Sequence, residues 1–597
     1  MTILPSENHQ ETIHNENYDQ KYNLQNLNHQ NLIFTENRPA QSLNGTWTFT
    51  IDPYDTGLRS DWNRLSHCDA AGRPVPWDYD YDGGEAVPVP SCWNMLRPEY
   101  YYYEGSAWYA REFTYREQAA GERVFLRIGA ASYDAKVFLN EAFLGNHYGG
   151  STPFCVELTG RLQERNVLQV CVNNTRTADR VPMRNTDWFN YGGIYRDVEL
   201  YRVPATFIKN FKIFLAPGAS DRRIRAEVEV DGPVRDGALR LELPELGIEQ
   251  TLPVSAGKGS LELEAAPELW SPEQPRLYAV RAEYQGDAIA LRVGFRRIEV
   301  RGTEILLNGK ALFLRGVCVH EDDTVLGKAT DEADLRRRFA DAKELGCNFL
   351  RLAHYPHTER AAQLADELGF LLWEEIPVYW AIDFENPATY RDAENQLLEL
   401  VRRDQNRASV IIWSVGNENA ATAPRLSFMS RLAEAARKED PTRLISAACL
   451  VNEKKIRIED PLADYLDVIG VNEYYGWYKL DFTELAQLGR NSAPVKPVII
   501  TETGADGLAG YHDDAAVLFT EEHMAEVYRK QVKFVKESDY IKGISPWILY
   551  DFQTPRRMNR YQQGVNRKGL IALDKKTRKA AFYVLQAFYR EKQAEGK

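Results

Sequence analysis

The stretch VIIWSVGNEN, residues 410–419, is a run of apolar and mostly β-branched residues that ends in an asparagine and a glutamate. A short run of this kind is typical of a strand that is buried on both faces of a parallel sheet. The stretch PVIITETG, residues 497–504, repeats the pattern and ends at Glu502. Both stretches therefore predict buried strands with a carboxylate at the carboxyl end.

Six more stretches after residue 301 have the same character, and helical segments such as 331–346, 358–369 and 516–537 separate them. The other predicted strands are ALFLRGVCV (311–319), NFLRLAH (348–354), LLWEEI (371–376), RLISAAC (443–449), DVIGVNEYY (467–475) and GISPWILYDF (543–552). Eight strands that alternate with helices predict a (β/α)₈ TIM barrel over residues 302–597. In such barrels the active site lies at the carboxyl ends of the strands.

The chain before the barrel has a different pattern. From residue 36 to residue 203, short alternating runs are separated by Gly, Pro, Asn and Asp, which predicts a jelly-roll β-sandwich. Residues 204–301 have the strand spacing of an immunoglobulin-like sandwich. Residues 1–35 are rich in Asn, Gln, His and Glu with little periodicity, and we expect a mobile N-terminal tail there. The predicted protein is therefore multidomain, with two β-sandwiches before the barrel.

Composition excludes several classes of function. The chain has 597 residues, of which 44% are hydrophobic and 27% are charged, and its formal charge is -13. A negative protein of this kind has no field that would attract nucleic acid or an anionic membrane. The sequence contains no apolar run long enough to span a bilayer, and its first residues lack the basic and apolar regions of a secretory signal. We therefore expect a cytoplasmic protein without nucleic-acid or membrane partners.

The sequence also lacks the signatures of common cofactors. The seven cysteines include no C-x-x-C pair, the histidines are dispersed, and no Gly-rich phosphate loop follows a strand. We expect no metal and no cofactor.

The two strand-end carboxylates, Glu418 and Glu502, point to one type of chemistry. For either glutamate alone, an ion-paired residue at the rim of the barrel is an equally good interpretation. Burial of the Asn-Glu pair is costly, however, and it would raise the pKa of Glu418 and keep that carboxyl protonated near neutral pH. A protonated carboxyl opposite an ionised one is the equipment of glycoside hydrolysis. One group is the acid, and the other is a nucleophile that retains configuration if the carboxyls lie about 5–5.5 Å apart, whereas a gap of about 6.5–9.5 Å admits a water and inverts it.

Several motifs carry a family likeness. They are WFNYGGIYRDVEL (188–200), GVCVHEDD (316–323), RLAHYPHT (351–358), SVGNEN (414–419), VNEYYGWY (471–478) and ITETGADGLAG (500–510). Together with the order of the domains, they resemble glycoside hydrolase family 2, and within it the β-glucuronidases. The resemblance implies a retaining enzyme in which Glu418 is the acid/base, Glu502 is the nucleophile and Asn417 donates to the 2-hydroxyl of the sugar.

The same resemblance implies further site residues. His354, Tyr474, Trp547 and Asp187 are expected to bind the sugar, Tyr474 through a hydrogen bond to the nucleophile and Trp547 by stacking beneath the ring. Asp187 belongs to the first sandwich and would reach the barrel mouth. Supporting roles at the mouth are expected for three residues, which are His320, Glu321 and Arg351. Each residue has a structural alternative. It is an aromatic wall for Tyr474, the barrel core for Trp547, an interdomain hydrogen bond for Asp187, and a hydrogen-bonded network that shapes the mouth for the others.

The stretch GVNRKGL, residues 564–570, separates uronides from neutral sugars. Asn566 and Lys568 match the Asn-x-Lys pair with which the resembling glucuronidases hold the sugar carboxylate. An ammonium group suits a carboxylate, and a neutral hydroxymethyl would leave that ammonium without a counter-charge.

The chain departs from the family pattern near this pair, because Glu473 and Gln562 stand where arginines are usual. Arg560, Arg556 or Arg557 could substitute for them. A β-galacturonide therefore rivals a β-glucuronide as the substrate.

Two alternatives to a glycuronidase remain open from the sequence. One is a β-galactosidase of the same family that acts on a neutral sugar, for which Asn566 and Lys568 would be incidental. The other is an inactive carbohydrate-binding protein, which the presence of both carboxylates argues against. The family precedent also leads us to expect a homo-oligomer.

Overall fold

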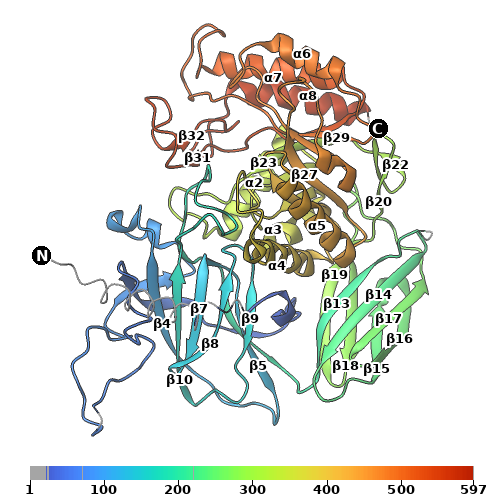
Figure 1. Ribbon diagram of the computed structural model, residues 1–597. Helices are drawn as coiled ribbons and strands as arrows, with labels where there is room; N and C mark the ends of the chain where they lie inside the picture. The colour runs from blue at the N-terminus through green and yellow to red at the C-terminus, as the bar shows by residue number, and fades with distance from the viewer. Residues whose placement is uncertain (1–21, 23, 25, 70, 219–220, 596–597) are drawn as a thin grey trace, which may run out of the picture.

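The computed structural model describes residues 22, 24, 26–69, 71–218 and 221–595. Figure 1 shows the first β-sandwich in blue at the lower left, the second in green at the lower right, and the barrel above both. The predicted class, two β-sandwiches followed by a TIM barrel, is confirmed.

The first sandwich has two antiparallel sheets that enclose an apolar core. One sheet has the order β1-β12-β5-β9, and the other has the order β3-β2-β4-β10-β7-β8. The strands are β1 (Ala40–Ser42), β2 (Gly45–Asp52), β3 (Glu85–Val89), β4 (Ser106–Thr114), β5 (Arg123–Ile128), β7 (Asp134–Leu139), β8 (Ala142–Tyr148), β9 (Phe154–Glu157), β10 (Arg165–Asn173) and β12 (Val198–Val203), with a short pair of β6 (Ala131–Ser132) and β11 (Gly193–Ile194). Alternate side chains such as Trp47, Phe49, Leu126 and Val170 fill the space between the sheets.

The second sandwich has the strand order β13-β14-β17-β16-β15-β18-β19. Its strands are β13 (Phe207–Leu215), β14 (Arg223–Asp231), β15 (Gly237–Leu243), β16 (Ile248–Ser255), β17 (Lys258–Glu264), β18 (Tyr278–Tyr284) and β19 (Asp287–Val293). Only two residue pairs join β16 to β17, and only three join β15 to β18, so the sheet folds over its own core at these weak junctions.

Eight parallel strands close the barrel, with β30 paired to β23. The strands are β23 (Leu314–Val319), β24 (Phe349–Leu352), β25 (Leu371–Glu375), β26 (Val410–Asn417), β27 (Leu444–Leu450), β28 (Ile469–Asn472), β29 (Val498–Glu502) and β30 (Ile541–Ile544). The predicted last strand is too long, because β30 ends three residues before Trp547. A small sheet of β20 (Ile298–Arg301), β21 (Glu304–Leu307) and β22 (Lys310–Ala311) closes the amino end, where Ile305 and Leu307 join the apolar core of the barrel.

Helices follow each strand except the fifth, after which the chain forms only a 3₁₀ turn, η5 (Pro461–Tyr465). The helices are α2 (Glu332–Leu345), α3 (Glu359–Leu368), α4 (Pro387–Asp404), α5 (Ala423–Glu439), α6 (Phe482–Asn491), α7 (Glu521–Lys536) and α8 (Ala580–Glu595). Between β30 and α8 the chain makes a long excursion that contains the short strands β31 (Phe552–Gln553) and β32 (Val565–Asn566). Residues 545–579 therefore leave the barrel at its carboxyl end before the last helix begins.

The expected mobile tail is corrected for residues 26–35. Leu27 is buried and donates its backbone N–H to Asn146 of the first sandwich, and His29 donates its backbone N–H to Asn395 of α4 at 2.8 Å. This segment therefore joins two domains, because Leu27 is buried in the apolar core of the first sandwich while His29 bonds to α4 of the barrel. Residues 1–21, 23 and 25 lie outside the described residues, and the prediction is not tested there.

A buried ion pair ties the first sandwich to the barrel. Arg196 donates to Glu321 at 2.8 Å, and it also donates to the carbonyls of Pro356 and Ser151. The other oxygen of Glu321 accepts the backbone N–H of Thr358 at 2.6 Å. Burial alone would raise the pKa of Glu321, but Arg196 and the other donors outweigh it and lower that pKa to about 2. Glu321 is therefore a domain-linking carboxylate.

We expect Arg196→Met to lower the free energy of unfolding by about 3 kcal/mol at pH 7, because it leaves Glu321 charged, buried and without its ion pair. Thermal melting of the two proteins measures the effect. Since the folded pKa of Glu321 lies below its ordinary value, its contribution is complete above about pH 4.5 and is lost as the pH falls toward 2. The difference in melting temperature should therefore shrink between pH 5 and pH 3.

The control is Arg336→Met, which removes an exposed pair between Arg336 and Glu332 on α2. Such surface pairs contribute little, so its melting temperature should barely change. Equal losses in the two variants would show that the domain contact does not depend on Arg196.

Candidate active site

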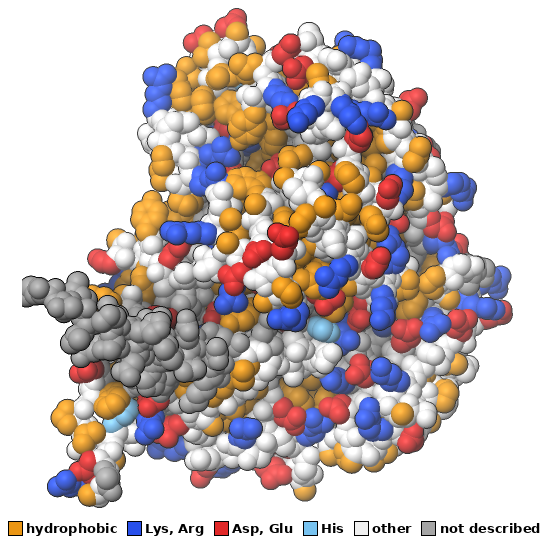
Figure 2. Space-filling model, viewed as in Figure 1, with side chains coloured by type: hydrophobic (Ala, Val, Ile, Leu, Met, Phe, Trp, Pro, Cys, Tyr) orange, Lys and Arg blue, Asp and Glu red, His pale blue; other side chains and the backbone are white. Residues whose placement is uncertain are grey.

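A pocket of about 500 Å³ opens at the carboxyl ends of the barrel strands. Its walls come from the barrel, from Asp187 of the first sandwich and from the excursion after β30. They include Asp187, His354, Tyr379, Trp380, Glu418, Leu450, Val451, Glu453, Asn472, Glu473, Tyr474, Tyr475, Tyr478, Lys479, Glu502, Trp547, Arg556, Arg557, Asn566 and Lys568. Figure 2 shows a hollow lined by hydrophobic side chains, with Lys and Arg at its edge, near the place where Figure 1 has β31 and β32.

Glu418 follows directly after β26 and lies in the left-handed region, with φ of 53°. Such a conformation costs a non-glycine residue of the order of 1 kcal/mol and is common at functional sites. Its two carboxyl oxygens accept hydrogen bonds from Asn472 Nδ2 at 2.9 Å and from Trp380 Nε1 at 2.7 Å. Burial, followed by the nearby charge of Glu502, raises the pKa of Glu418 to about 7 despite these donors. A substantial fraction of Glu418 is therefore protonated at neutral pH.

Glu502 is the last residue of β29 and receives two strong donors. Arg351 Nη1 lies 2.6 Å from its Oε1, and the hydroxyl of Tyr474 lies 2.7 Å from its Oε2. The expected hydrogen bond between Tyr474 and this carboxylate is therefore present. A guanidinium and a phenol hydroxyl fix the orientation of both oxygens, which suits an anionic group with one required direction of attack.

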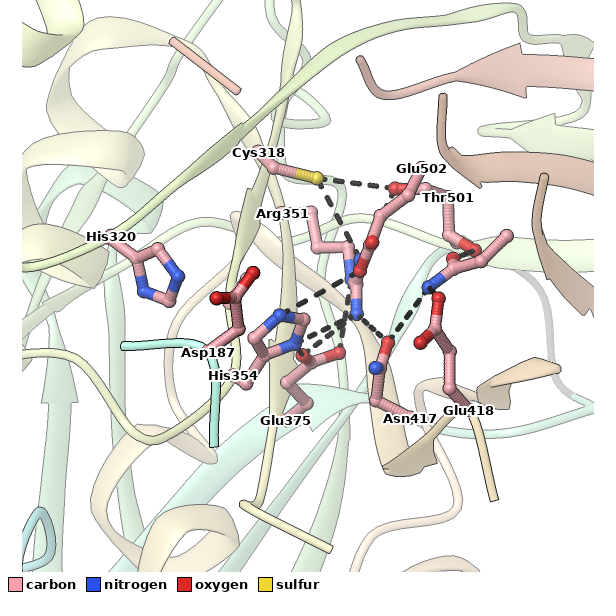
Figure 3. A network of polar contacts seen from close by, with 12 residues as sticks. Asp187, Cys318, His320, Arg351, His354, Glu375, Asn417, Glu418, Thr501 and Glu502 are labelled. Atoms are coloured by element: carbon pink, nitrogen blue, oxygen red, sulfur yellow. Dashed lines mark hydrogen bonds and ion pairs between the residues drawn. The ribbon is translucent and has the colours of Figure 1, made fainter. Parts of the chain in front are cut away.

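Arg351, the third residue of β24, joins the polar groups at the base of the pocket (Figure 3). Besides Glu502, it donates to both oxygens of Glu375 at 2.9 and 3.1 Å and to Asn417 Oδ1 at 2.7 Å. Burial would raise the pKa of Glu375, but Arg351 and His354 hold it below its ordinary value. The guanidinium thus makes charge-assisted bonds to two buried carboxylates.

Asn417 is held with its donor group unused. Its Oδ1 accepts from Arg351 and from Asn472 Nδ2 at 3.1 Å, whereas its Nδ2 is buried and has no hydrogen-bond partner within the described residues. An unpaired buried amide donor costs roughly 1–3 kcal/mol. This donor matches the sugar contact that the resemblance implies for Asn417.

His354 and Trp547 form the base of the pocket. Their rings are nearly parallel, with centroids 4.8 Å apart, and His354 Nδ1 lies 2.8 Å from Glu375. The Nε2 of His354 lies 3.7 Å from Glu502, so both rings are beside the reacting groups.

Two predicted supporting residues do not reach the carboxylates. His320 packs against Trp547 and Phe552 and bonds to Tyr355, and Figure 3 draws it with no contact to Glu502. Glu321 pairs with Arg196, away from the pocket. Neither residue lines the pocket, and their contacts join the barrel to neighbouring segments.

Lys568 is buried at one end of the pocket and has its own counter-charge, which corrects the expectation above. Its Nζ lies 2.5 Å from Asp506 and donates to the hydroxyl of Tyr478 at 3.3 Å. Gln562 also donates to Asp506, at 2.9 Å. A neutral sugar would therefore not leave the ammonium unpaired. An ammonium has three donors, so one hydrogen of Lys568 remains available to a ligand.

Asp187 reaches the barrel mouth, as the resemblance implies, and lies within an ion pair. Arg557 pairs with it, Thr554 donates to it at 3.2 Å, and Asn566 Nδ2 donates to it at 3.3 Å.

Of the residues that depart from the family pattern, Glu473 accepts from Tyr475 N and from Gln531 of α7, and burial raises its pKa to about 7. Arg557 shares its partner Asp187 with Asn566, and it lines the pocket together with Lys568.

Several site residues were not anticipated from the sequence: Glu375, Asn472, Trp380 and Asp506. Glu375 and Asn472 end the strands β25 and β28, so the strand-end rule that identified Glu418 would also have found them. Trp380 and Asp506 lie in loops and carry no such signal.

Within the described residues, no cluster of His, Cys, Asp and Glu could hold a metal ion. The described helices also include none with the length and apolar character needed to cross a bilayer.

Two family models match this chain. Residues 298–592 match the TIM barrel domain of glycosyl hydrolases family 2, and residues 40–204 match the sugar binding domain of the same family. A β-glucuronidase of Paenibacillus borealis is 30% identical, over 92% of this chain and 96% of its own.

Solved structures of two bacterial enzymes are also similar. A β-galacturonidase of Eisenbergiella tayi bound to galacturonate has a TM-score of 0.79 and 27% identity, over 94% of this chain and 99% of its own. A β-glucuronidase of Ruminococcus gnavus in complex with D-glucuronic acid has a TM-score of 0.81 and 25% identity, over 94% of this chain and 100% of its own.

Trp380→Phe should raise the pKa of Glu418 above 7, because it removes a hydrogen bond that favours the carboxylate while keeping an apolar ring in place. Infrared spectra are recorded over a pH series for the wild type and for Trp380→Phe. Subtracting the spectra of the same protein with Glu418→Gln added isolates the titration of this carboxyl. The control is Trp77→Phe, which alters a half-exposed ring in the first sandwich. A downward shift in Trp380→Phe would contradict the assigned hydrogen bond.

Proposed function

We infer the activity of this protein from one premise, which is that the chain belongs to glycoside hydrolase family 2. It is a glycoside hydrolase of the β-glucuronidase and β-galacturonidase type. We propose that it releases a terminal β-D-uronic acid with retention of configuration, through a covalent glycosyl-enzyme. The observation that carries the catalytic part is the contrast between Glu418, whose pKa is about 7, and Glu502, which Arg351 and Tyr474 hold in a fixed direction.

In the first step, Glu502 attacks the anomeric carbon while Glu418 gives its proton to the glycosidic oxygen. The bond to the leaving group breaks, and a bond between the sugar and Glu502 forms. Asn417 Nδ2, a buried donor without a partner among the described residues, would bind a sugar hydroxyl next to the reacting carbon. Donors of this kind accelerate the reaction only if they bind the transition state more strongly than the ground state.

In the second step, Glu418 is a carboxylate and accepts a proton from water, whose oxygen displaces Glu502 from the sugar. Formation of the glycosyl-enzyme removes the negative charge of Glu502. Because that charge contributes to the raised pKa of Glu418, the pKa should fall when the intermediate forms, which favours the base form when it is needed.

The uronate end of the proposed site consists of Lys568, Tyr478, Asn566 and Arg557. The ring of Tyr478 lies 5.1 Å from Lys568 Nζ, and its hydroxyl can donate to a carboxylate while it accepts from the ammonium. Arg557 and Lys568 each have a carboxylate partner, Asp187 and Asp506. Both cations keep their carboxylate partners when a neutral sugar binds. Selectivity for a uronide therefore rests on the charge-assisted bonds that the sugar carboxylate adds.

The epimer is decided by experiment, since similar enzymes with known structures bind glucuronic acid or galacturonate. Hydrolysis of p-nitrophenyl β-glucuronide, β-galacturonide and β-galactoside tests the proposal as a whole. A preference for the galactoside would replace it with the β-galactosidase alternative. A cytoplasmic location and a homo-oligomeric state stay predictions from the sequence.

Glu502→Gln should abolish turnover of every substrate, whereas Glu418→Gln should spare substrates with acidic phenol leaving groups. The reason is that a good leaving group needs little protonation, so its kcat/KM, which reports the first step, should fall less than about tenfold, while kcat/KM for poor leaving groups falls about 10²- to 10⁴-fold. The second step also loses its base, so kcat for good leaving groups should fall, and azide should restore it by replacing the water that the base activates. Steady-state rates for a series of aryl uronides measure both effects.

The pH profile provides the matching control. In the wild type, kcat/KM should fall above about pH 7, where Glu418 loses its proton, and this alkaline limb should disappear in Glu418→Gln. Glu522→Gln, which changes an exposed carboxylate paired with His512, should keep the wild-type profile. An unchanged alkaline limb in Glu418→Gln would assign the acid to another residue.

Lys568→Met should lower kcat/KM for the uronide by at least about 10²-fold, about 2.7 kcal/mol, as expected for one lost charged contact. Because this change alone leaves Asp506 buried and unpaired, the decisive protein is the double variant Lys568→Met/Asp506→Asn. Its activity on the β-galactoside should hold steady or rise. Equal losses for uronide and galactoside in the double variant would refute the role of Lys568 in selectivity.

A further inference from the structure

We propose that the leaving-group side of the pocket is a binding site for a carboxylate on the aglycone, and that Arg556 is its cation. The inference rests on the proposed function, and it adds the class of leaving group to the class of sugar. It concerns substrates in which the uronic acid is joined to an acidic partner, such as a second acidic sugar or a phenolic acid.

The position of Glu418 defines where the leaving group lies, because the acid must reach the oxygen that joins the two parts of the substrate. Glu418 follows β26, and the strands on its two sides are β25 and β27. Trp380 follows β25 and donates to Glu418, while Leu450 ends β27 and Val451 follows it. All three side chains line the pocket, so the aglycone would lie between an indole ring and an apolar wall.

Arg556 extends the indole side of this space. Its guanidinium carbon lies 4.6 Å from the centroid of the Trp380 ring, whose Nε1 in turn contacts Glu418. Such stacking holds the guanidinium plane while its N–H groups remain free at the edges. A carboxylate bound there would be next to the leaving-group oxygen and beyond the sugar.

Arg556 also differs from the other cations of the pocket. Lys568 pairs with Asp506, Arg557 pairs with Asp187, and Lys479 pairs with Glu453 at 3.1 Å. The guanidinium of Arg556 has neither a carboxylate within 4 Å nor a hydrogen-bond acceptor among the residues that the structure describes.

The charge balance at the mouth follows from this difference. An arginine fork without a partner is complementary to a carboxylate, which it binds through two parallel hydrogen bonds. Among the residues that the structure describes, the pocket thus has one uncompensated cation, on the side of Glu418 that faces the aglycone. A neutral leaving group would gain nothing from it.

The test compares aryl uronides that differ only in charge, the 4-carboxyphenyl and 4-carbamoylphenyl compounds, on wild type and Arg556→Gln. The ratio of kcat/KM for acid to amide should fall about tenfold or more in the variant, in line with one charge-assisted contact. The two phenols differ in pKa, but this difference affects the wild type and the variant equally, so it cancels when their ratios are compared. High salt should lower the wild-type ratio and leave that of the variant unchanged, since the site is at the surface.

A second arm uses disaccharides in which the uronic acid is linked to either a uronic acid or the corresponding neutral sugar. For each pair, the effect of Arg556→Gln is the change in the ratio of kcat/KM for the acidic substrate to that for the neutral one. A larger change for the disaccharides than for the aryl compounds assigns the natural aglycone to an acidic sugar. A larger change for the aryl compounds assigns it to a phenolic acid. Arg560→Gln is the matched control, because Arg560 lies in the same excursion, is exposed and stacks on Tyr561 outside the pocket. Its ratios should equal those of the wild type.

The proposal is overturned if Arg556→Gln lowers the rates for acid and amide alike. Such a result, together with a shift of the alkaline limb, would mean that Arg556 acts on Glu418 through Trp380. Failure of the proposed function looks different, because the protein would then cleave galactosides and no uronide. The same pair of aglycones carried on a galactoside would still decide the role of Arg556.

Discussion

The buried guanidinium of Arg351 holds the polar groups of the pocket in one arrangement. It is fully buried and donates to Glu375, Glu502 and Asn417, which lie on three different strands of the barrel. Two carboxylates around one cation are stable only with direct hydrogen bonds, since removal of the cation would leave both charges desolvated. Arg351 orients Glu502 together with Tyr474, and it orients the amide of Asn417 together with Asn472.

The two reacting glutamates differ in their donors, and this difference gives them different chemistry. Glu502 receives a charged donor from Arg351 and a phenol hydroxyl from Tyr474. Glu418 receives only neutral N–H groups, from Asn472 and Trp380, so burial and the charge of Glu502 prevail and its pKa rises to about 7. Two identical side chains can thus serve as acid and nucleophile in one pocket, because their donors differ and because burial and the charge of Glu502 raise the pKa of Glu418.

The first sandwich completes the pocket through apolar and polar contacts. Val181 joins the apolar core of the barrel, and Trp188 packs against barrel aromatic residues. Among the polar contacts, Arg196 pairs with Glu321 near the barrel mouth, and Asp187 pairs with Arg557 of the excursion after β30. Because Asp187 also accepts from Asn566, the sandwich orients the residues at the proposed uronate end. A barrel without this domain would keep Glu418 and Glu502 on their strands but lose one wall of the site.

The sequence by itself determined the barrel, because buried parallel strands read as continuous apolar runs and their carboxyl ends meet at one mouth. The same rule located Glu418, Glu502 and Asn417, and it would have located Glu375 and Asn472, which end two other strands. These residues are predictable since strand periodicity fixes their place without reference to distant parts of the chain. The motifs of the family supplied Asp187, Tyr474 and Lys568, whose positions depend on loops.

Only the tertiary structure decided which groups pair. Asp506 neutralises Lys568, Arg196 takes Glu321 away from the catalytic groups, and residues 26–35 pack between two domains instead of forming a free tail. Arg556 remains without a carboxylate partner among the described residues, although Arg557 beside it has one. Ion pairs between residues hundreds of positions apart leave no periodic signal in the sequence, because their energy depends on distance and burial, which exist only after the domains have assembled.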